Sequence, residues 1–263
     1  MKGNNEFRIK RKGSAFSLPL TPKMNAIEIN KLSKRFEIET EKNVGILGRL
    51  LSFNKKAKII HAFRDFSLDI EKGEALGIIG KNGVGKTTLL KLISGVYKPT
   101  SGKIKINGKM GSFIGLSIGF HYDLTVRDNI FLYAALRGML REEIAKKFNE
   151  IIKFAELENF VDTKFKRLSS GMQARLAFAT AIQTNPDILL LDEVLAVGDK
   201  EFYKKCLSVT ENFKKSGKTI LFVSHNLDAI KQFCTKVLYL RKDNSYEIGK
   251  PNDVINTYLK ENK

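Results

Sequence analysis

The sequence has no tryptophan, only five prolines and only two cysteines, Cys206 and Cys234, in 263 residues. The cysteines form no Cys-x-x-Cys pair and no Cys/His pairing, so neither a zinc site nor a disulfide framework is expected. We expect two small buried thiols instead. No apolar run approaches the roughly 18 to 20 residues that a membrane-spanning helix needs, so no such helix is predicted.

Acidic residues are also scarce, with 28 Asp and Glu against 46 Lys and Arg, which gives a formal net charge of +18. Such a charge attracts polyanions such as ATP, anionic lipid headgroups or nucleic acid. The excess is mostly scattered lysine, however, and no basic face is interleaved with aromatic residues that stack bases. We therefore expect no nucleic-acid partner. The hydrophobic content of 43% is enough for a sizeable core.

The beginning of the chain differs in composition from the rest. Residues 1–23 are polar and basic, contain Pro19 and Pro22, and lack the apolar segment of a secretory signal, so they predict a basic flexible extension. The folded domain is predicted to span 24–263. Within it, residues 41–58 combine apolar positions at helical spacing with basic residues, which predicts a short amphipathic insert.

The remaining pattern predicts an α/β fold. Strand-like segments at 26–29 and 59–70 indicate a small antiparallel β subdomain, and helical patterns indicate an insertion at about 118–167 that begins with a capping box, Thr125 and Asp128. Short apolar strands that alternate with helices indicate a parallel core sheet covered on both faces. These strands are expected at 75–79, 187–191, 219–223 and 237–240.

One loop after the first of these strands fits G-x-x-x-x-G-K-[ST] and is followed by a helical pattern at 86–93. Its glycines allow backbone N–H groups to converge on phosphate oxygens, Lys86 reaches the β- and γ-phosphates, and the Thr87 hydroxyl suits Mg²⁺. The sequence therefore predicts binding of a nucleoside triphosphate with Mg²⁺. The nucleotide-binding residues predicted in this loop are Gly80, Lys81, Asn82, Gly83, Val84, Gly85, Lys86, Thr87 and Thr88.

Polar residues also follow two later strands, where the carboxyl ends of parallel strands meet at one edge of a sheet. Asp192 is predicted to hold Mg²⁺ through water, and Glu193 to accept a proton from the attacking water or to orient it. His225 is predicted to hydrogen-bond the γ-phosphate. The predicted catalytic residues are therefore Lys86, Glu193 and His225. The alternatives are that the acidic pair caps a helix and that His225 is an ordinary surface residue.

A further motif precedes a helix that ends near Gln183. It comprises Ser169, Ser170, Gly171 and Met172, which follow Leu168. Ser169 is a natural N-cap, and the amide groups of a helix N-terminus attract anions.

Together these segments resemble the ATP-binding cassette (ABC) family. The resemblance places Walker A at 80–87, the signature at 168–172, Walker B at 187–192 followed by Glu193, a D-loop ending at Asp199, and the switch histidine at His225. It implies a head-to-tail homodimer, in which the signature of one subunit closes over ATP held by the Walker motifs of the other. It also implies that Phe36 stacks on adenine.

The signature of this chain differs from the usual one, and the difference indicates one branch of the family. Most cassettes have Leu-Ser-Gly-Gly-Gln where this chain has Leu168-Ser-Ser-Gly-Met172, and this variant is similar to exporters of bacterial polysaccharides such as O antigen, capsule and teichoic acid. The expected function is to hydrolyse ATP at the cytoplasmic face of the inner membrane. This would drive a lipid-linked glycan through a separate polytopic permease. The glutamine that the family carries near 115–120 is missing, so the backbone or Ser117 would replace it.

A second function class stays open on the sequence alone. A cassette can also act as a nucleotide-gated clamp on nucleic acid or ribosomes. Such proteins usually contain long coiled coils or two cassettes, and this sequence has neither.

Overall fold

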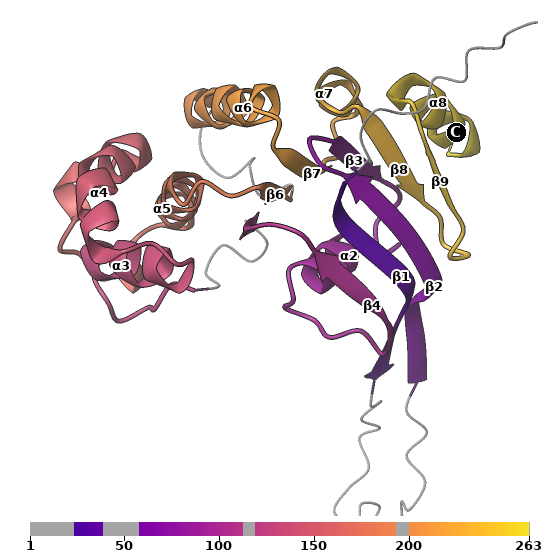
Figure 1. The fold of residues 1–263 in the computed structure, drawn as a ribbon, viewed down its shortest axis with the longest axis horizontal. Coiled ribbons are helices and arrows are strands. Elements are labelled where there is room, and N and C mark those ends of the chain that lie inside the picture. Colours follow the sequence, from indigo (N-terminus) through magenta and orange to yellow (C-terminus); the bar gives the residue numbers. More distant parts are fainter. Residues whose placement is uncertain (1–23, 39–57, 113–118, 193–199, 263) are drawn as a thin grey trace, which may run out of the picture.

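The computed structural model describes residues 24–38, 58–112, 119–192 and 200–262, which are drawn in colour in Figure 1. The predicted N-terminal extension at 1–23 and all of the predicted amphipathic insert except Lys58 lie outside the described residues. No helix in the described ranges combines the length and the apolar character that a membrane crossing requires.

The strands belong to two sheets. The smaller sheet has the order β2-β1-β4, and the larger has the order β5-β6-β7-β3-β8-β9. The strand bounds are β1 Asn25–Ile38, β2 Lys58–Glu71, β3 Ala75–Ile79, β4 Ser101–Ile106, β5 Met110–Ser112, β6 Ile188–Leu191, β7 Thr219–Val223, β8 Lys236–Leu240 and β9 Tyr246–Gly249.

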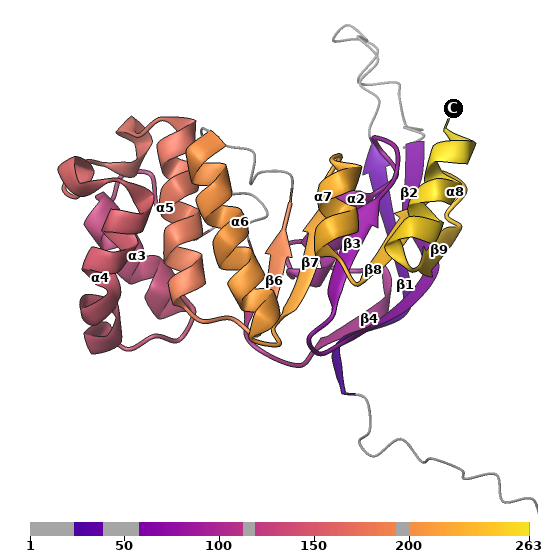
Figure 2. The ribbon, with the colours of Figure 1, turned by 90° about the horizontal axis from the view of Figure 1, so that it is seen from above.

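The helices connect and cover these sheets, as Figures 1 and 2 show. Their bounds are α2 Lys86–Ile93, α3 Val126–Leu136, α4 Arg141–Ala155, α5 Ser170–Gln183, α6 Lys200–Lys215, α7 Leu227–Phe233 and α8 Pro251–Glu261, with short 3-10 turns at Glu158–Phe160 and Phe165–Arg167.

The larger sheet is the parallel core that the apolar runs predicted. β5, β6, β7, β3 and β8 are all parallel to their neighbours, and only the edge strand β9 pairs in antiparallel fashion with β8. The sequence did not predict β9, because its alternating residues sit at an edge and are only partly buried. The parallel strands place their carboxyl ends along one edge of the sheet.

The smaller sheet is antiparallel, as predicted, but it is not built only from the segment before the phosphate-binding loop. β1 pairs with β2 on one side and with β4 on the other, and β4 follows α2 in the chain. β4 was not predicted, because its residues Ser101–Ile106 are mostly exposed and the apolar signal is weak. The β1 strand itself is longer than the expected segment at 26–29.

Two hydrophobic clusters form the core, one on each face of the parallel sheet. Along β6, Leu190 packs toward α2 and the antiparallel sheet, whereas Leu189 and Leu191 pack toward α5, α6 and α7. Successive side chains of a strand point to opposite faces, so a strand covered on both faces is apolar throughout. Gly77 in β3 permits this packing, since a Cβ there would lie 2.8 Å from Ile230 of α7.

The helices α3 and α4 fall in the region where the sequence predicted a helical insertion. The Thr125 hydroxyl accepts a hydrogen bond from the Asp128 N–H, and the Asp128 carboxylate accepts from the Thr125 N–H, which is the predicted capping box. Phe165 is fully buried and stacks on Phe120 at a ring-centroid distance of 5.2 Å. This aromatic contact fixes the segment that leads into α5.

Candidate functional site

A cavity of about 670 Å³ lies at the carboxyl edge of the parallel sheet. It is lined by residues from the loop after β3, from the ends of β6, β7 and β8, and from the antiparallel sheet. The lining residues are Phe36, Ile60, His61, Ala62, Asn82, Gly83, Val84, Gly85, Lys86, Thr87, Thr88, Asp192, Val223, His225, Arg241, Lys242 and Asn244.

The loop between β3 and α2 follows a path that glycine makes possible. Gly80 has φ 149°, and a Cβ there would lie 2.6 Å from the Leu240 carbonyl oxygen at the end of β8. Gly85 is the N-cap of α2 with φ 107°, and a Cβ would lie 3.1 Å from the Phe63 ring. Side chains at either position would strain the backbone or force the loop away from its neighbours. The loop therefore presents its backbone to the cavity at the N-terminus of α2.

Lys86 is the charged group at the base of this loop. Its side chain is buried, with 7% of the residue exposed, and Nζ donates to the Gly80 carbonyl oxygen at 2.6 Å and to that of Lys81 at 3.2 Å. Gly80 and Lys81 do not line the cavity themselves but hold this ammonium group beside it. Lys86 is thus positioned at the loop whose backbone surrounds the proposed phosphates.

Asp192 and His225 reach the same cavity from two other strands. Asp192 directly follows β6 and is buried, with 8% of the residue exposed, and His225 lies in the connection from β7 to α7. The Asn226 N–H donates to Ser224 Oγ at 3.1 Å, and the Asn226 side chain caps α7. These bonds hold the backbone on both sides of His225. The structure therefore brings together the three strand-end segments that the sequence singled out.

The antiparallel sheet supplies the opposite wall, with Phe36 from β1 and His61 from β2. Phe36 is half-buried and packs edge-on against Tyr97 with ring centroids 5.5 Å apart. Phe36 therefore borders the cavity, and its stacking on adenine stays a prediction. No motif points to His61, because it reaches this wall through the pairing of Arg35 with His61 between β1 and β2.

Three further lining residues, Arg241, Lys242 and Asn244, were also missed. They belong to the turn between β8 and β9, and no motif marks it in the sequence. A polar turn after the apolar strand β8 is the only signal that was available. His121, by contrast, takes part in a local loop network: its N–H donates to Asn129 Oδ1 at 2.6 Å, and its carbonyl oxygen accepts from Asn129 Nδ2.

The signature segment lies outside the cavity lining. Ser169 is the N-cap of α5, and its hydroxyl accepts a hydrogen bond from the Met172 N–H at 3.2 Å. Gln173 Nε2 donates to the carbonyl oxygens of Phe165 and Leu168, which holds the preceding loop in place. Figures 1 and 2 both show α5 separated from α2 by β6. The buried side chains of α5 belong to the core cluster on one face of the parallel sheet and those of α2 to the cluster on the other, so within one chain the motif of Ser169, Ser170, Gly171 and Met172 does not adjoin the cavity.

Two predicted residues, Glu193 and Asp199, lie outside the described residues, as do residues 115–118 of the loop that lacks a glutamine. Their proposed roles stay predictions. At the start of the Walker B segment, Asp187 has a structural role: its carboxylate accepts from the Lys109 N–H at 2.9 Å and from Lys218 Nζ at 3.2 Å. These bonds, the first above all, lower the pKa of Asp187.

Comparison with protein families identifies the family to which this chain belongs. The family model described as ABC transporter matches residues 63–196, which is just over half of the chain. The chain belongs to the ABC transporter family. The nucleotide-binding ATPase character that the motifs predicted follows from this membership, and the predicted P-loop fold is confirmed by the solved cassettes to which this structure is similar.

Several curated relatives are similar to this chain. The O-antigen export system ATP-binding protein RfbB of Klebsiella pneumoniae is 45% identical over 75% of this chain and 80% of that protein. The protein of the same name from Myxococcus xanthus is 44% identical over 78% of this chain. That match covers only 47% of the Myxococcus protein, so this chain spans about half of its length. The teichoic acids export ATP-binding protein TagH of Listeria innocua is 39% identical over 88% of this chain and 69% of the relative.

Solved structures give the same result for the fold. A dimeric ATP-binding cassette in a post-hydrolysis state, bound to ADP and Pi, is 26% identical with a TM-score of 0.68, covering 86% of this chain and 98% of that one. The ATP-binding subunit of another ABC transporter has a TM-score of 0.70 at 20% identity, covering 89% of this chain and 93% of that one. The latter likeness bears on the fold alone.

Proposed function

We propose that this chain is the ATP-hydrolysing subunit of a bacterial exporter that moves a lipid-linked polysaccharide across the inner membrane through a separate transmembrane subunit. The observation that carries the proposal is the meeting of the phosphate loop, Asp192 and His225 around one cavity. The substrate class comes from the relatives, whose names assign them to export of O antigen and teichoic acids.

The cavity suits a nucleoside triphosphate. The loop at the N-terminus of α2 and the Lys86 ammonium group supply positive potential for phosphate oxygens, and Phe36 offers an aromatic surface for a base. Phosphoryl transfer requires mainly positioning and charge neutralisation, which is what this arrangement provides. His225 lines the same cavity and is proposed to hydrogen-bond the terminal phosphate, and Glu193 is proposed to orient the attacking water.

The donor set also fits Mg²⁺. The Thr87 hydroxyl and the Asp192 carboxylate both line the cavity, and Mg²⁺ takes oxygen ligands while keeping several waters. When bound, Mg²⁺ would neutralise charge on the phosphates.

The remote signature supports a homodimer. Ser169 does not line the cavity of its own chain, and the buried side chains of α5 pack on the opposite face of the parallel sheet from those of α2. Two copies arranged head to tail would bring each signature over the other copy's ATP. One similar solved cassette is a dimer, which supports this assembly.

The proposed location is the cytoplasmic face of the inner membrane, reached through a polytopic permease. The glycan would contact this chain only indirectly. A clamp on nucleic acid or ribosomes is the second class, but no observation favours it.

The decisive experiment is recovery of the tagged chain from native membranes in mild detergent. Export predicts co-purification with a polytopic membrane subunit and ATP-dependent movement of a lipid-linked glycan in proteoliposomes that contain both proteins. Recovery with ribosomes or DNA that is lost after nuclease treatment would support the clamp instead. ATP hydrolysis without glycan movement in the reconstituted complex would contradict the export assignment.

A further inference from the structure

The turn between β8 and β9, residues 241–245, forms part of the cavity wall although it carries no recognised motif. Three of its residues, Arg241, Lys242 and Asn244, line the cavity together with the phosphate loop. The phosphate loop touches the end of β8 directly, because Gly80 lies against the Leu240 carbonyl oxygen. The turn is therefore an immediate neighbour of the segment that surrounds the proposed phosphates.

The turn has a fixed conformation. The Arg241 N–H donates to the Ser245 carbonyl oxygen at 3.0 Å, and Asp243 Oδ1 accepts from the Ser245 N–H at 2.9 Å and from its hydroxyl at 2.7 Å. Asn244 has φ 66°, the left-handed conformation that asparagine tolerates better than most residues and that three-residue hairpin loops use. These bonds hold the backbone that carries Lys242 beside the cavity.

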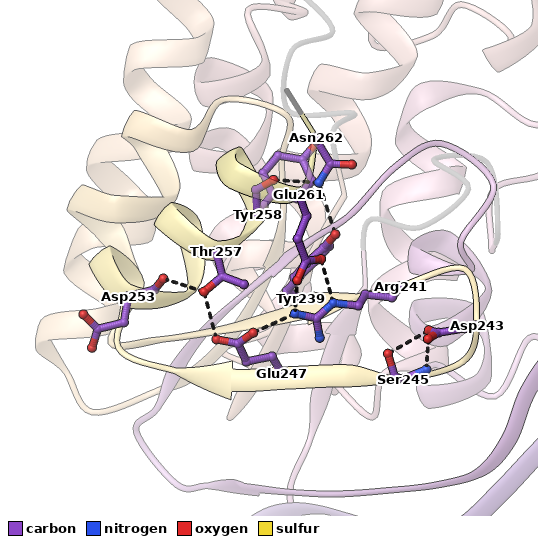
Figure 3. A network of polar contacts seen from close by, with 10 residues as sticks. All are labelled: Tyr239, Arg241, Asp243, Ser245, Glu247, Asp253, Thr257, Tyr258, Glu261 and Asn262. Carbon is purple, nitrogen blue, oxygen red and sulfur yellow. Dashed lines mark hydrogen bonds and ion pairs between the residues drawn. The ribbon is translucent and has the colours of Figure 1, made fainter.

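Arg241 and Lys242 differ in how their charges are used. The Arg241 guanidinium donates to Glu247 at 2.8 Å and to both carboxylate oxygens of Glu261, and it lies 4.4 Å from the Tyr239 ring centroid (Figure 3). Two carboxylates thus neutralise it. Lys242 is exposed and, within the ranges that the structure describes, makes no hydrogen bond or ion pair. Its ammonium group is the charge that the turn has available for an anionic ligand.

The position of the turn tells which part of a nucleotide it faces. In the sheet order β6-β7-β3-β8, the strands before Asp192 and His225 lie on one side of β3, and β8 lies on the other. The first residue of β9, Tyr246, contacts β2: its ring is 4.8 Å from that of Phe66, and its hydroxyl donates to the Ser67 carbonyl oxygen at 2.7 Å. The turn is therefore next to the antiparallel sheet that carries Phe36 and His61, away from the strand ends proposed to face the terminal phosphate.

We propose that Lys242 is a further nucleotide-binding residue, which acts on the ribose and α-phosphate end of the nucleotide from the wall opposite His225. This inference rests on the proposed function, because it takes the cavity as the nucleotide site. An ammonium group at this end contributes equally to binding of ATP and ADP, since both contain the ribose and the α-phosphate. It leaves the chemical step at the γ-phosphate unchanged.

The test is calorimetric titration of the purified chain with ATP and with ADP in EDTA, which blocks turnover. Lys242→Ala should weaken both affinities by about five- to tenfold, an effect that decreases at high salt because it is electrostatic. Lys242→Arg should retain affinity close to that of the natural chain. Lys250→Ala is the matched control, because Lys250 is also an exposed lysine, close in the chain but outside the cavity lining.

Each other outcome overturns the assignment in a recognisable way. If Lys242→Ala binds both nucleotides like Lys250→Ala while Lys86→Ala loses binding, Lys242 has no role and the proposed function is unaffected. If only ATP binding is weakened, Lys242 acts at the terminal phosphate, contrary to its assigned place. If the natural chain binds neither nucleotide, the proposed function itself fails. Thermal unfolding of each variant shows whether a loss of binding reflects a loss of fold.

Discussion

Arg241 and Glu261 form a bidentate ion pair that joins the end of the core strand β8 to the C-terminal helix α8. Nε donates to Oε2 at 2.8 Å and Nη2 donates to Oε1 at 2.9 Å, as Figure 3 shows. Near the same place, Asn262 Nδ2 donates to the Tyr239 hydroxyl at 3.1 Å. The helix that ends the described chain is thereby attached to a residue of the cavity wall.

Because of this ion pair, we expect the thermal stability of the chain to depend on pH. The hydrogen bond from Arg241, above all, lowers the pKa of Glu261 below its ordinary value of 4.5. A lowered pKa means that the folded state binds fewer protons, so the contribution to stability is complete above 4.5 and is lost as the pH falls through the folded value. Glu261→Gln should lower the thermal unfolding midpoint at neutral pH, and its difference from the natural chain should shrink as the pH falls below about 4.5 and through the lowered pKa.

Thermal unfolding followed by circular dichroism measures this difference, with Glu150→Gln on the exposed face of α4 as the control for loss of one carboxylate. A difference that stays constant over the whole pH range would show that the ionised carboxylate is not its cause.

Ser169 and Thr125 are both helix N-caps, so substituting each one separates the loss of a cap from the loss of an ATP contact. Ser169→Ala should remove the cap of α5 and cost about 1 kcal/mol of stability. Thr125→Ala should cost a similar amount at α3, which lies outside the proposed ATP interface. ATPase assays should show a severe loss only for Ser169→Ala, because this hydroxyl is proposed to face the partner's ATP. Equal ATPase activity in the two variants would remove Ser169 from that role.

The cysteines should be inert in the folded chain. Burial raises the pKa of both Cys206 and Cys234 to about 12, and only 1% and 6% of these residues are exposed. Since the thiolate is the reactive form, we expect no alkylation by iodoacetamide at about pH 8 until the protein is unfolded, and two labelled thiols afterwards. Intact-protein mass spectrometry counts the labels. Rapid labelling of either thiol under native conditions would contradict the buried positions.

The proposed role of Glu193 predicts a separation of binding from turnover. Glu193→Gln should retain ATP binding, hydrolyse ATP very slowly and accumulate as a closed dimer, because the water would no longer be oriented while the phosphate site stays intact. Light scattering with ATP and Mg²⁺ detects the dimer. Glu150→Gln, at an exposed carboxylate of α4 outside the cavity lining, is the control for loss of one acidic group. Near-normal turnover by Glu193→Gln would exclude Glu193 as the water-orienting group.

Local patterns in the sequence were enough to predict much of the cavity. The residues of the phosphate loop are consecutive in the chain, and the spacing of its glycines predicts the turns that its backbone makes. Asp192 and His225 could be found because each follows an apolar run, and parallel strands end at a common edge for a general geometric reason. The Thr125 capping box and the Ser169 N-cap also depend on residues three positions apart. In all these cases, the deciding interactions lie close together in the chain.

What only the tertiary structure decided is which distant surfaces complete the cavity. His61 reaches it through the register between β1 and β2, and Lys242 through the packing of β8 beside β3. Neither pairing has a local signature, because the registers are set by side chains buried from several elements at once. The amino-acid sequence alone thus determined the phosphate-binding chemistry and the parallel core. The tertiary packing determined the wall opposite that chemistry and the separation of Ser169 from its own chain's nucleotide loop.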